Sequence, residues 1–123
     1  MIIAKKILVV DDEQDIVEIL IYNLSKQKLE VRGAYSGTEC IRIAKQFHPD
    51  LIVMDVRMPE TNGIEACRML KLDEELKNIP VLFLTADTDQ NTLISAITAG
   101  GNRCVNKPIP ISELTELIMK MVA

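Results

Sequence analysis

The stretch Pro49–Pro59 reads PDLIVMDVRMP and carries the strongest local signal for the fold. Its segment Leu51–Met54 is apolar at every position, without the alternating polar residues of a strand that faces water on one side. Such a run is typical of a strand covered on both faces, as in a parallel sheet. The run ends at Asp55, so a carboxylate stands at the carboxyl end of the predicted strand.

Four further short runs occur along the chain, and amphipathic segments separate them. The runs are Ile7–Val10, Leu29–Ala34, Val81–Leu84 and Arg103–Val105. Apolar residues three or four positions apart indicate helices in the segments. These stripes comprise Ile16, Ile19, Leu20 and Leu24; Cys40, Ile43, Ala44 and Phe47; Ile64, Cys67 and Leu70; Leu93 and Ile97; and Leu114, Leu117, Ile118 and Met121. Five strands alternating with five helices predict an α/β fold with a single doubly wound parallel sheet.

Polar residues and glycines mark several helix ends. Ser36, Asn62 and Ser112 each precede a predicted helix, where a side-chain oxygen can accept a hydrogen bond from the first turn. Gly100 and Gly101 follow the fourth predicted helix, as glycine commonly does at a helix end.

The composition narrows the class of protein. The chain has 123 residues, 48% hydrophobic and 26% charged, so we expect one domain over residues 1–123, alone or excised from a longer protein. The net charge of −4, without a basic stripe, argues against direct nucleic-acid binding. No apolar run is long enough to span a membrane. Three scattered cysteines favour a reducing, cytoplasmic location over a disulfide framework or a zinc site.

Reactive side chains follow four of the five predicted strands. They are Asp11 and Asp12, Asp55, Thr85, and Lys107. In an open parallel sheet these positions share one edge, where ligands bind. Neighbouring carboxylates repel one another unless a cation lies between them, and Mg²⁺ prefers such oxygen ligands. With an ammonium and a hydroxyl nearby, these groups suit phosphoryl transfer, in which a carboxylate can itself be the acceptor.

Each of these residues also has a structural interpretation when taken alone. Asp12 could cap a helix, and Thr85 could simply favour a strand. The joint arrangement favours the functional interpretation. Adjacent Asp11 and Asp12 suit a metal ion, which leaves Asp55 as the preferred acceptor.

Four motifs in register resemble the receiver domain of two-component response regulators, the CheY-like family. They are ILVVDDE (Ile7–Glu13), PDLIVMDVRMP with Gly63, PVLFLTA (Pro80–Ala86), and the spaced Gly100 and Lys107–Pro108. The resemblance implies a flavodoxin-like (βα)5 fold with strand order 2-1-3-4-5. It also implies a signalling module that catalyses only its own phosphoryl transfer and dephosphorylation, rather than a metabolic enzyme.

The resemblance further implies a role for each site residue. Asp55 would accept a phosphoryl group from a phosphohistidine of a sensor histidine kinase or a histidine phosphotransfer protein. Asp11, Asp12, Asp55 and the main-chain carbonyl of Arg57 would bind Mg²⁺. Thr85 and Lys107 would contact the phosphoryl group, and the bond before Pro108 would be cis. A downstream output protein or domain would read the result, with the domain itself a monomer or a weak dimer.

Two features of this chain change what we expect of its response to phosphorylation and of its rate of dephosphorylation. Cys104 stands where receivers commonly carry an aromatic residue that reports phosphorylation. We therefore expect the response in the segment Thr85–Asn91 and the following helix, whose surface around Thr92, Ser95 and Thr98 a partner would read. The opposite charges of Arg57 and Asp87 should overhang the site and, if paired, slow hydrolysis; substituting either residue should then speed it.

Three other classes of protein fit the sequence less well. A phosphatase of the haloacid dehalogenase type needs Asp-x-Asp at a strand end, but Glu13 follows Asp11 at that spacing and Arg57 follows Asp55. A flavodoxin-like cofactor carrier would need a phosphate-cradling loop where this chain has repelling carboxylates. A degenerate receiver that acts as a scaffold is disfavoured because all five expected site residues are present.

Overall fold

The computed structural model describes residues 3–87 and 89–123, and Thr88, in the segment expected to respond, lies outside the described residues. The strands are β1 (Lys6–Val10), β2 (Glu30–Ala34), β3 (Leu51–Asp55), β4 (Val81–Thr85) and β5 (Arg103–Asn106). The helices are α1 (Gln14–Ser25), α2 (Gly37–Phe47), α3 (Gly63–Leu72), α4 (Gln90–Thr98) and α5 (Ile111–Met121). Strands and helices therefore alternate along the chain as the sequence predicts.

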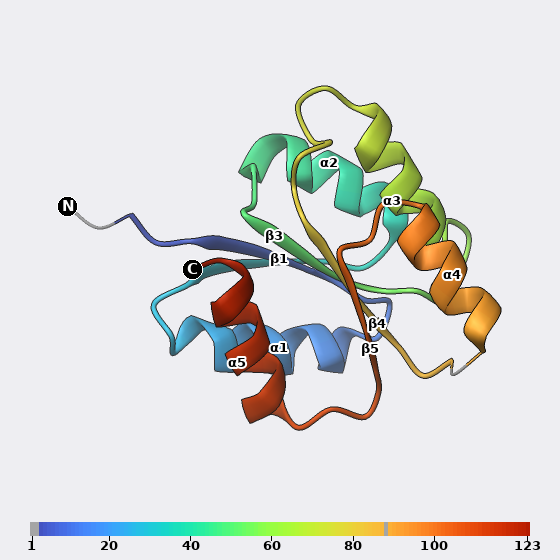
Figure 1. Cartoon of the computed structure of the whole chain (residues 1–123). Coiled ribbons are helices and arrows are strands. Elements are labelled where there is room, and N and C mark those ends of the chain that lie inside the picture. Colours follow the sequence, from blue (N-terminus) through green and yellow to red (C-terminus); the bar gives the residue numbers. More distant parts are fainter. Residues whose placement is uncertain (1–2, 88) are drawn as a thin grey trace.

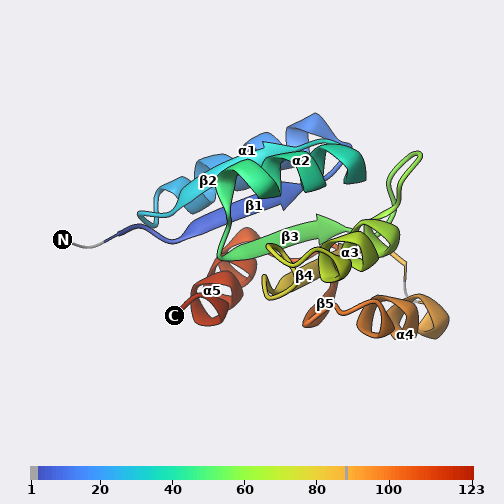
Figure 2. The same ribbon diagram turned by 90° about the horizontal axis from the view of Figure 1, so that it is seen from above.

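The strands form one parallel sheet in the order β2-β1-β3-β4-β5, which confirms the predicted fold. Helices α1 and α5 cover one face of the sheet, and α2, α3 and α4 cover the other (Figures 1 and 2). Each face has its own apolar core. Every residue of β3 and β4 is buried, which explains why their sequences show no polar alternation.

The structure confirms most of the predicted helix ends. Ser36 Oγ accepts a hydrogen bond from Glu39 N–H at 3.1 Å, and Asn62 Oδ1 accepts one from Glu65 N–H at 2.9 Å. Gly100 has a φ of 108°, a conformation that strains other residues.

The predicted start of the last helix at Ser112 is wrong. Helix α5 begins at Ile111, directly after Pro110. Proline suits the entrance to a helix because its φ is already near the helical value and its missing N–H would have had no partner there. The first turn therefore does not need a serine cap.

The expected packing stripe on α4 is also wrong. Leu93 and Ile97 are 45% and 48% exposed, and the helix buries Ala96 instead. The chain approaches the sheet closely here: a Cβ added at Gly101 would lie 2.6 Å from the Phe83 ring. Only small side chains fit in so narrow a space, so the larger apolar residues of α4 face outward.

Within the described ranges, every helix is too short or too polar to cross a membrane.

Candidate phosphoryl-transfer site

The sheet brings the predicted site residues to a single edge. Val10 pairs with Met54, so Asp11 and Asp55 stand at the ends of adjacent strands. Thr85 ends β4 on the other side of β3, and Lys107 directly follows β5. Residues that are far apart in sequence thus meet at the carboxyl edge of the sheet.

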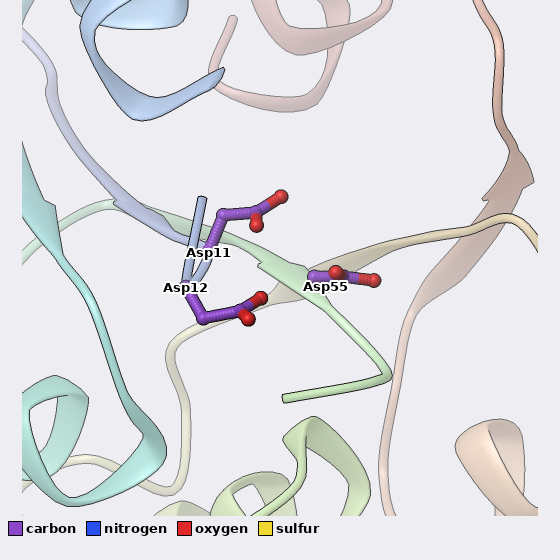
Figure 3. A group of neighbouring side chains, drawn as sticks. All are labelled: Asp11, Asp12 and Asp55. Atoms are coloured by element: carbon purple, nitrogen blue, oxygen red, sulfur yellow. The ribbon is translucent and has the colours of Figure 1, made fainter. Parts of the chain in front are cut away.

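Three carboxylates cluster at this edge, from the ends of β1 and β3 (Figure 3). Asp11, Asp12 and Asp55 each offer an oxygen, and these oxygens lie within 4.8 Å of one another. Asp11 and Asp55 are buried, whereas Asp12 is exposed. Asp12 does not cap α1, since Glu13 occupies that position.

Lys107 lies against two of these carboxylates. Its Nζ donates a hydrogen bond to Asp11 Oδ2 at 3.0 Å and lies 3.5 Å from Asp55 Oδ2. Its main-chain N–H donates to the carbonyl oxygen of Thr85 at 2.8 Å, and the Lys107–Pro108 bond is cis, as the resemblance implied. Burial would lower the pKa of Lys107, but contacts with Asp11 and Asp55 outweigh burial and raise it. The ammonium therefore stays charged.

The environment of Asp55 disfavours a bare negative charge. Burial raises the pKa of this carboxyl above its usual value, and the nearby charge of Asp11 adds to the rise. The Lys107 ammonium and a hydrogen bond from Arg57 N–H to Asp55 Oδ1, at 3.3 Å, oppose it. Further positive charge at this edge would thus stabilise the ionised Asp55.

The cluster fits a small divalent cation. All three candidate ligands are hard carboxylate oxygens, the donors that Mg²⁺ prefers. Opposite ligands of Mg²⁺ stand roughly 4 Å apart, since each lies about 2.0–2.1 Å from the ion. The observed spread of up to 4.8 Å is close to that span, so a small inward movement of the side chains would complete the site.

The start of α3 lies directly against the carboxyl end of β3. A Cβ added at Gly63 would lie 2.2 Å from the carbonyl oxygen of Asp55, and Gly63 N–H donates to the carbonyl oxygen of Val56 at 2.9 Å. The glycine in the matched motif is thus required by the close approach of α3 to the loop after β3.

Thr85 and the predicted charge pair lie beside the carboxylates. Thr85 is 1% exposed, and its Oγ1 accepts a hydrogen bond from Asp87 N–H at 3.0 Å. Arg57 forms an ion pair with Asp87, so the pairing that the sequence left open is present in the structure. The hydrogen bond from Arg57 holds the pKa of Asp87 at about 2, with help from Asp89 N–H and the Thr92 hydroxyl.

Sequence reasoning missed the contact between Asp87 and Thr92. The Thr92 hydroxyl donates to Asp87 Oδ2 at 3.0 Å, so this threonine is half-buried and not simply a surface residue. The available signal was an acidic residue shortly before a helix whose first turn contains a threonine.

The cysteines lie apart from this edge. Cys40 and Cys67 are buried in the core beneath α2 and α3, and burial followed by the neighbouring Cys67 raises the pKa of Cys40 to about 12. Cys104 is partly buried against the same core, and burial raises its pKa as well. These thiols therefore stay protonated and unreactive near neutral pH.

Comparison with known proteins identifies the class that this fold and site define. A sequence profile for the response regulator receiver domain matches residues 7–119. The chain belongs to this family and is a CheY-like receiver domain, a signalling module of two-component systems. The comparisons give no support to a phosphatase of the haloacid dehalogenase type.

Particular relatives agree with this assignment. The chain is 38% identical over 110 residues to the alkaline phosphatase synthesis transcriptional regulatory protein PhoP of Bacillus subtilis (strain 168). That alignment covers 89% of this chain and 45% of PhoP, so the chain spans somewhat less than half of this curated relative.

Solved structures of similar size match nearly the whole chain. Chemotaxis protein CheY4 of Vibrio cholerae has a TM-score of 0.91 and 26% identity, covering 97% of this chain and 99% of that chain. The signal receiver domain of a signal transduction histidine kinase from Syntrophus aciditrophicus has a TM-score of 0.88 and 30% identity. The match covers 97% of this chain and 90% of that chain. Similar domains thus occur both as a chemotaxis protein and as part of a histidine kinase.

Proposed function

We propose that Asp55 accepts a phosphoryl group from a phosphohistidine of a sensor histidine kinase or a histidine phosphotransfer protein. One observation carries this proposal above the rest. Asp55 shares the edge of the sheet with two other carboxylates within 4.8 Å, while the Lys107 ammonium lies 3.5 Å from its Oδ2. An acceptor beside a metal-binding pair and a fixed cation is the arrangement that phosphoryl transfer requires.

In the proposed step, a carboxylate oxygen of Asp55 attacks phosphorus. The new P–O bond forms as the P–N bond to the donor histidine breaks, and the electron pair of that bond stays on the imidazole nitrogen. Lys107 holds positive charge beside the transferred oxygens, and Thr85 offers a hydroxyl donor. Mg²⁺, held by Asp11, Asp12, Asp55 and the Arg57 carbonyl, would neutralise charge on the phosphoryl oxygens. Hydrolysis reverses the modification, as water breaks the P–O bond and releases phosphate.

Burial and contacts favour Asp55 over the other carboxylates as acceptor. The oxygens of Asp11 are held more closely, by Lys107 Nζ and Glu13 N–H at 3.0 Å each, than those of Asp55, which lie 3.5 Å from Lys107 Nζ and 3.3 Å from the Arg57 nitrogen. Asp12 is exposed, which suits a ligand of a metal ion that keeps part of its water shell. Asp55 is flanked by Thr85 on the neighbouring strand and by Lys107, the two groups suited to hold a phosphoryl group.

The phosphorylated domain would regulate a downstream output protein or domain through the surface around α4. Because the chain aligns with 45% of PhoP, an output domain elsewhere in the same protein is one form this could take. A separate partner protein is the other. In either form we propose that the domain works in the cytoplasm as a monomer or weak dimer.

Intact-mass spectrometry tests the acceptor function. Wild type treated with acetyl phosphate and Mg²⁺ should gain the mass of one phosphoryl group, and chelation of the metal should prevent the gain. Asp55→Asn should gain nothing. Asp15→Asn, which removes an exposed carboxylate from the first turn of α1, is the matched control and should label like wild type. Equal labelling of Asp55→Asn and wild type would contradict the proposal.

A further inference from the structure

Asp87 lies between the acidic edge and α4 and bonds to both. Its N–H donates to Thr85 Oγ1 at 3.0 Å, and its carboxylate pairs with the Arg57 guanidinium. On the helix side, Thr92 donates its hydroxyl hydrogen to Asp87 Oδ2 at 3.0 Å, and Asp89 N–H donates to Oδ1 at 2.8 Å. One residue thus joins the loop after β3, the end of β4 and the first turn of α4.

The two partners on the site side are groups that a phosphoryl group would attract. A phosphoryl group adds about 1.5–2 negative charges and three strong acceptor oxygens. A guanidinium binds such oxygens in pairs, whereas Asp87 offers Arg57 a single negative charge. The Arg57 side chain is 73% exposed, so little packing holds it against Asp87. Its main chain already contacts the acceptor, since Arg57 N–H donates to Asp55 Oδ1.

Helix α4 is well placed to respond because little apolar packing holds it. Of its residues, Ala96 is buried, while Leu93, Ile94 and Ile97 are 45%, 55% and 48% exposed. Just beyond its far end, the thiol of Cys67 donates to the carbonyl oxygen of Ala99 at 3.4 Å. The first turn is held instead by polar contacts, from the Asp89 cap to Asn91 N–H and from Asp87 to the Thr92 hydroxyl.

We propose that Arg57, Asp87 and Thr92 form a tether that holds the first turn of α4 in the unphosphorylated protein, and that phosphorylation of Asp55 releases it. The release rests on the proposed function, because it requires the phosphoryl group to draw Arg57 away from Asp87. The Asp87 carboxylate then loses its cation, faces a like charge and withdraws, and the contact with Thr92 is disrupted. This route needs no large ring at position 104, where the chain has a cysteine.

Hydrogen exchange in the unphosphorylated protein tests the tether itself. Thr92→Val removes the hydroxyl donor with little change of shape and leaves Arg57 and Asp87 in place. Loss of one such hydrogen bond should speed amide exchange across residues 90–98 by roughly two- to tenfold. Thr98→Val, at the exposed far end of the same helix, is the matched control and should exchange like wild type. Wild-type exchange in Thr92→Val would overturn the proposal.

The affinity for a phosphoryl mimic tests whether binding at Asp55 is coupled to the contact between Asp87 and Thr92. A contact that only stabilises the helix would not change this affinity. If binding at Asp55 must break the tether, removing the tether must strengthen that binding by the same factor. Trifluoroberyllate with Mg²⁺, followed by fluorine NMR, should bind Thr92→Val roughly two- to tenfold more tightly than wild type or Thr98→Val. The mimic should also speed exchange over residues 90–98 in wild type, and less so in Thr92→Val. Equal affinities in all three proteins would overturn the release.

Together, the two experiments distinguish a failure of the tether from a failure of the proposed function. If trifluoroberyllate fails to bind wild type, the function of Asp55 and the release step both fail, while exchange in the free proteins still decides the tether. If it binds wild type but not Asp55→Asn, and Thr92→Val matches wild type in both measurements, the proposed function stands and the tether is wrong.

Discussion

Lys107 Nζ lies 3.0 Å from Asp11 Oδ2, although 96 positions separate the two residues in the chain. The contact links the end of β5 to the end of β1 across the acidic edge, and the same ammonium lies 3.5 Å from Asp55. A single cation therefore compensates two buried carboxylates, with Asp12 beside them. Much of the site's electrostatics depends on this one side chain.

Removing that cation should destabilise the metal-free protein. In Lys107→Met, Asp11 and Asp55 lose their shared partner and repel each other, which should lower the free energy of unfolding by about 1–3 kcal/mol. Urea unfolding with and without Mg²⁺ measures this. Mg²⁺ should recover more stability in the variant than in wild type, because it supplies the missing positive charge. An equal Mg²⁺ effect in both proteins would contradict the assigned role of Lys107.

Removing one carboxylate should weaken metal binding. Asp12→Asn keeps the shape of an exposed side chain but removes its charge. We expect Mg²⁺ affinity to fall by at least about tenfold, the lower end of the losses seen when a residue that only supports a metal ligand is removed. Calorimetric titration with Mg²⁺ measures the loss. Asp15→Asn, three residues further along, serves as the control. A variant that binds Mg²⁺ like wild type would exclude Asp12 as a ligand.

The sequence predicted the site far better than the neighbouring helix. Asp55 could be located because buried strands leave an unmistakable apolar run, and parallel strands end at a common edge. The strand order came only from the family resemblance, since periodicity does not say which strands are neighbours. The spacing of Leu93 and Ile97 indicated a helix correctly but not its buried face, which depends on how closely α4 approaches Phe83.

The Arg57–Asp87 pair could also be foreseen, because each residue lies two positions beyond the end of one of two adjacent strands. The third member of the tether, Thr92, was only weakly indicated, by its place in the first turn of a helix that follows an acidic residue. Its contact with Asp87 depends on how the loop between β4 and α4 turns, and residue types alone do not determine that path.

Arg57 should slow hydrolysis of the phosphorylated protein. An exposed ionic contact is weak because water screens it, so Arg57→Ala should dephosphorylate only roughly 1.5–5-fold faster. Release of inorganic phosphate over time measures the rate. The sequence alone predicted that Asp87→Ala would have the same effect, through an intact pair over the site. If Arg57 instead turns to the phosphoryl group, Asp87→Ala should match wild type or be slower, and an equal acceleration would contradict release of the tether.

Asp73, remote from the site, should give a pH-dependent contribution to stability. Its carboxylate accepts a hydrogen bond from Glu75 N–H at 2.9 Å and pairs with Lys45 at 3.1 Å, and these contacts, the first most strongly, lower its pKa below the usual 3.8. A carboxyl with a lowered pKa in the folded state stabilises the fold above its ordinary pKa, and this stability is lost as the pH falls through the folded value.

Urea unfolding of wild type and Asp73→Asn over a pH series measures that contribution. Asparagine can still accept from Glu75 N–H, so the comparison isolates the charge. Wild type should be more stable than the variant at neutral pH, and the difference should shrink as the pH drops below about 4. A difference that grows in acid would contradict the assignment.

The central claim is that Asp55 carries the phosphoryl group, and locating the modified residue tests it most directly. Borohydride reduces an aspartyl phosphate to homoserine, so the protein is treated with acetyl phosphate and Mg²⁺, reduced, digested and mapped by peptide mass spectrometry. Homoserine at position 55, lost when Mg²⁺ is chelated, is the predicted result. Homoserine at position 11 or 12 instead, or at no position, would contradict the account.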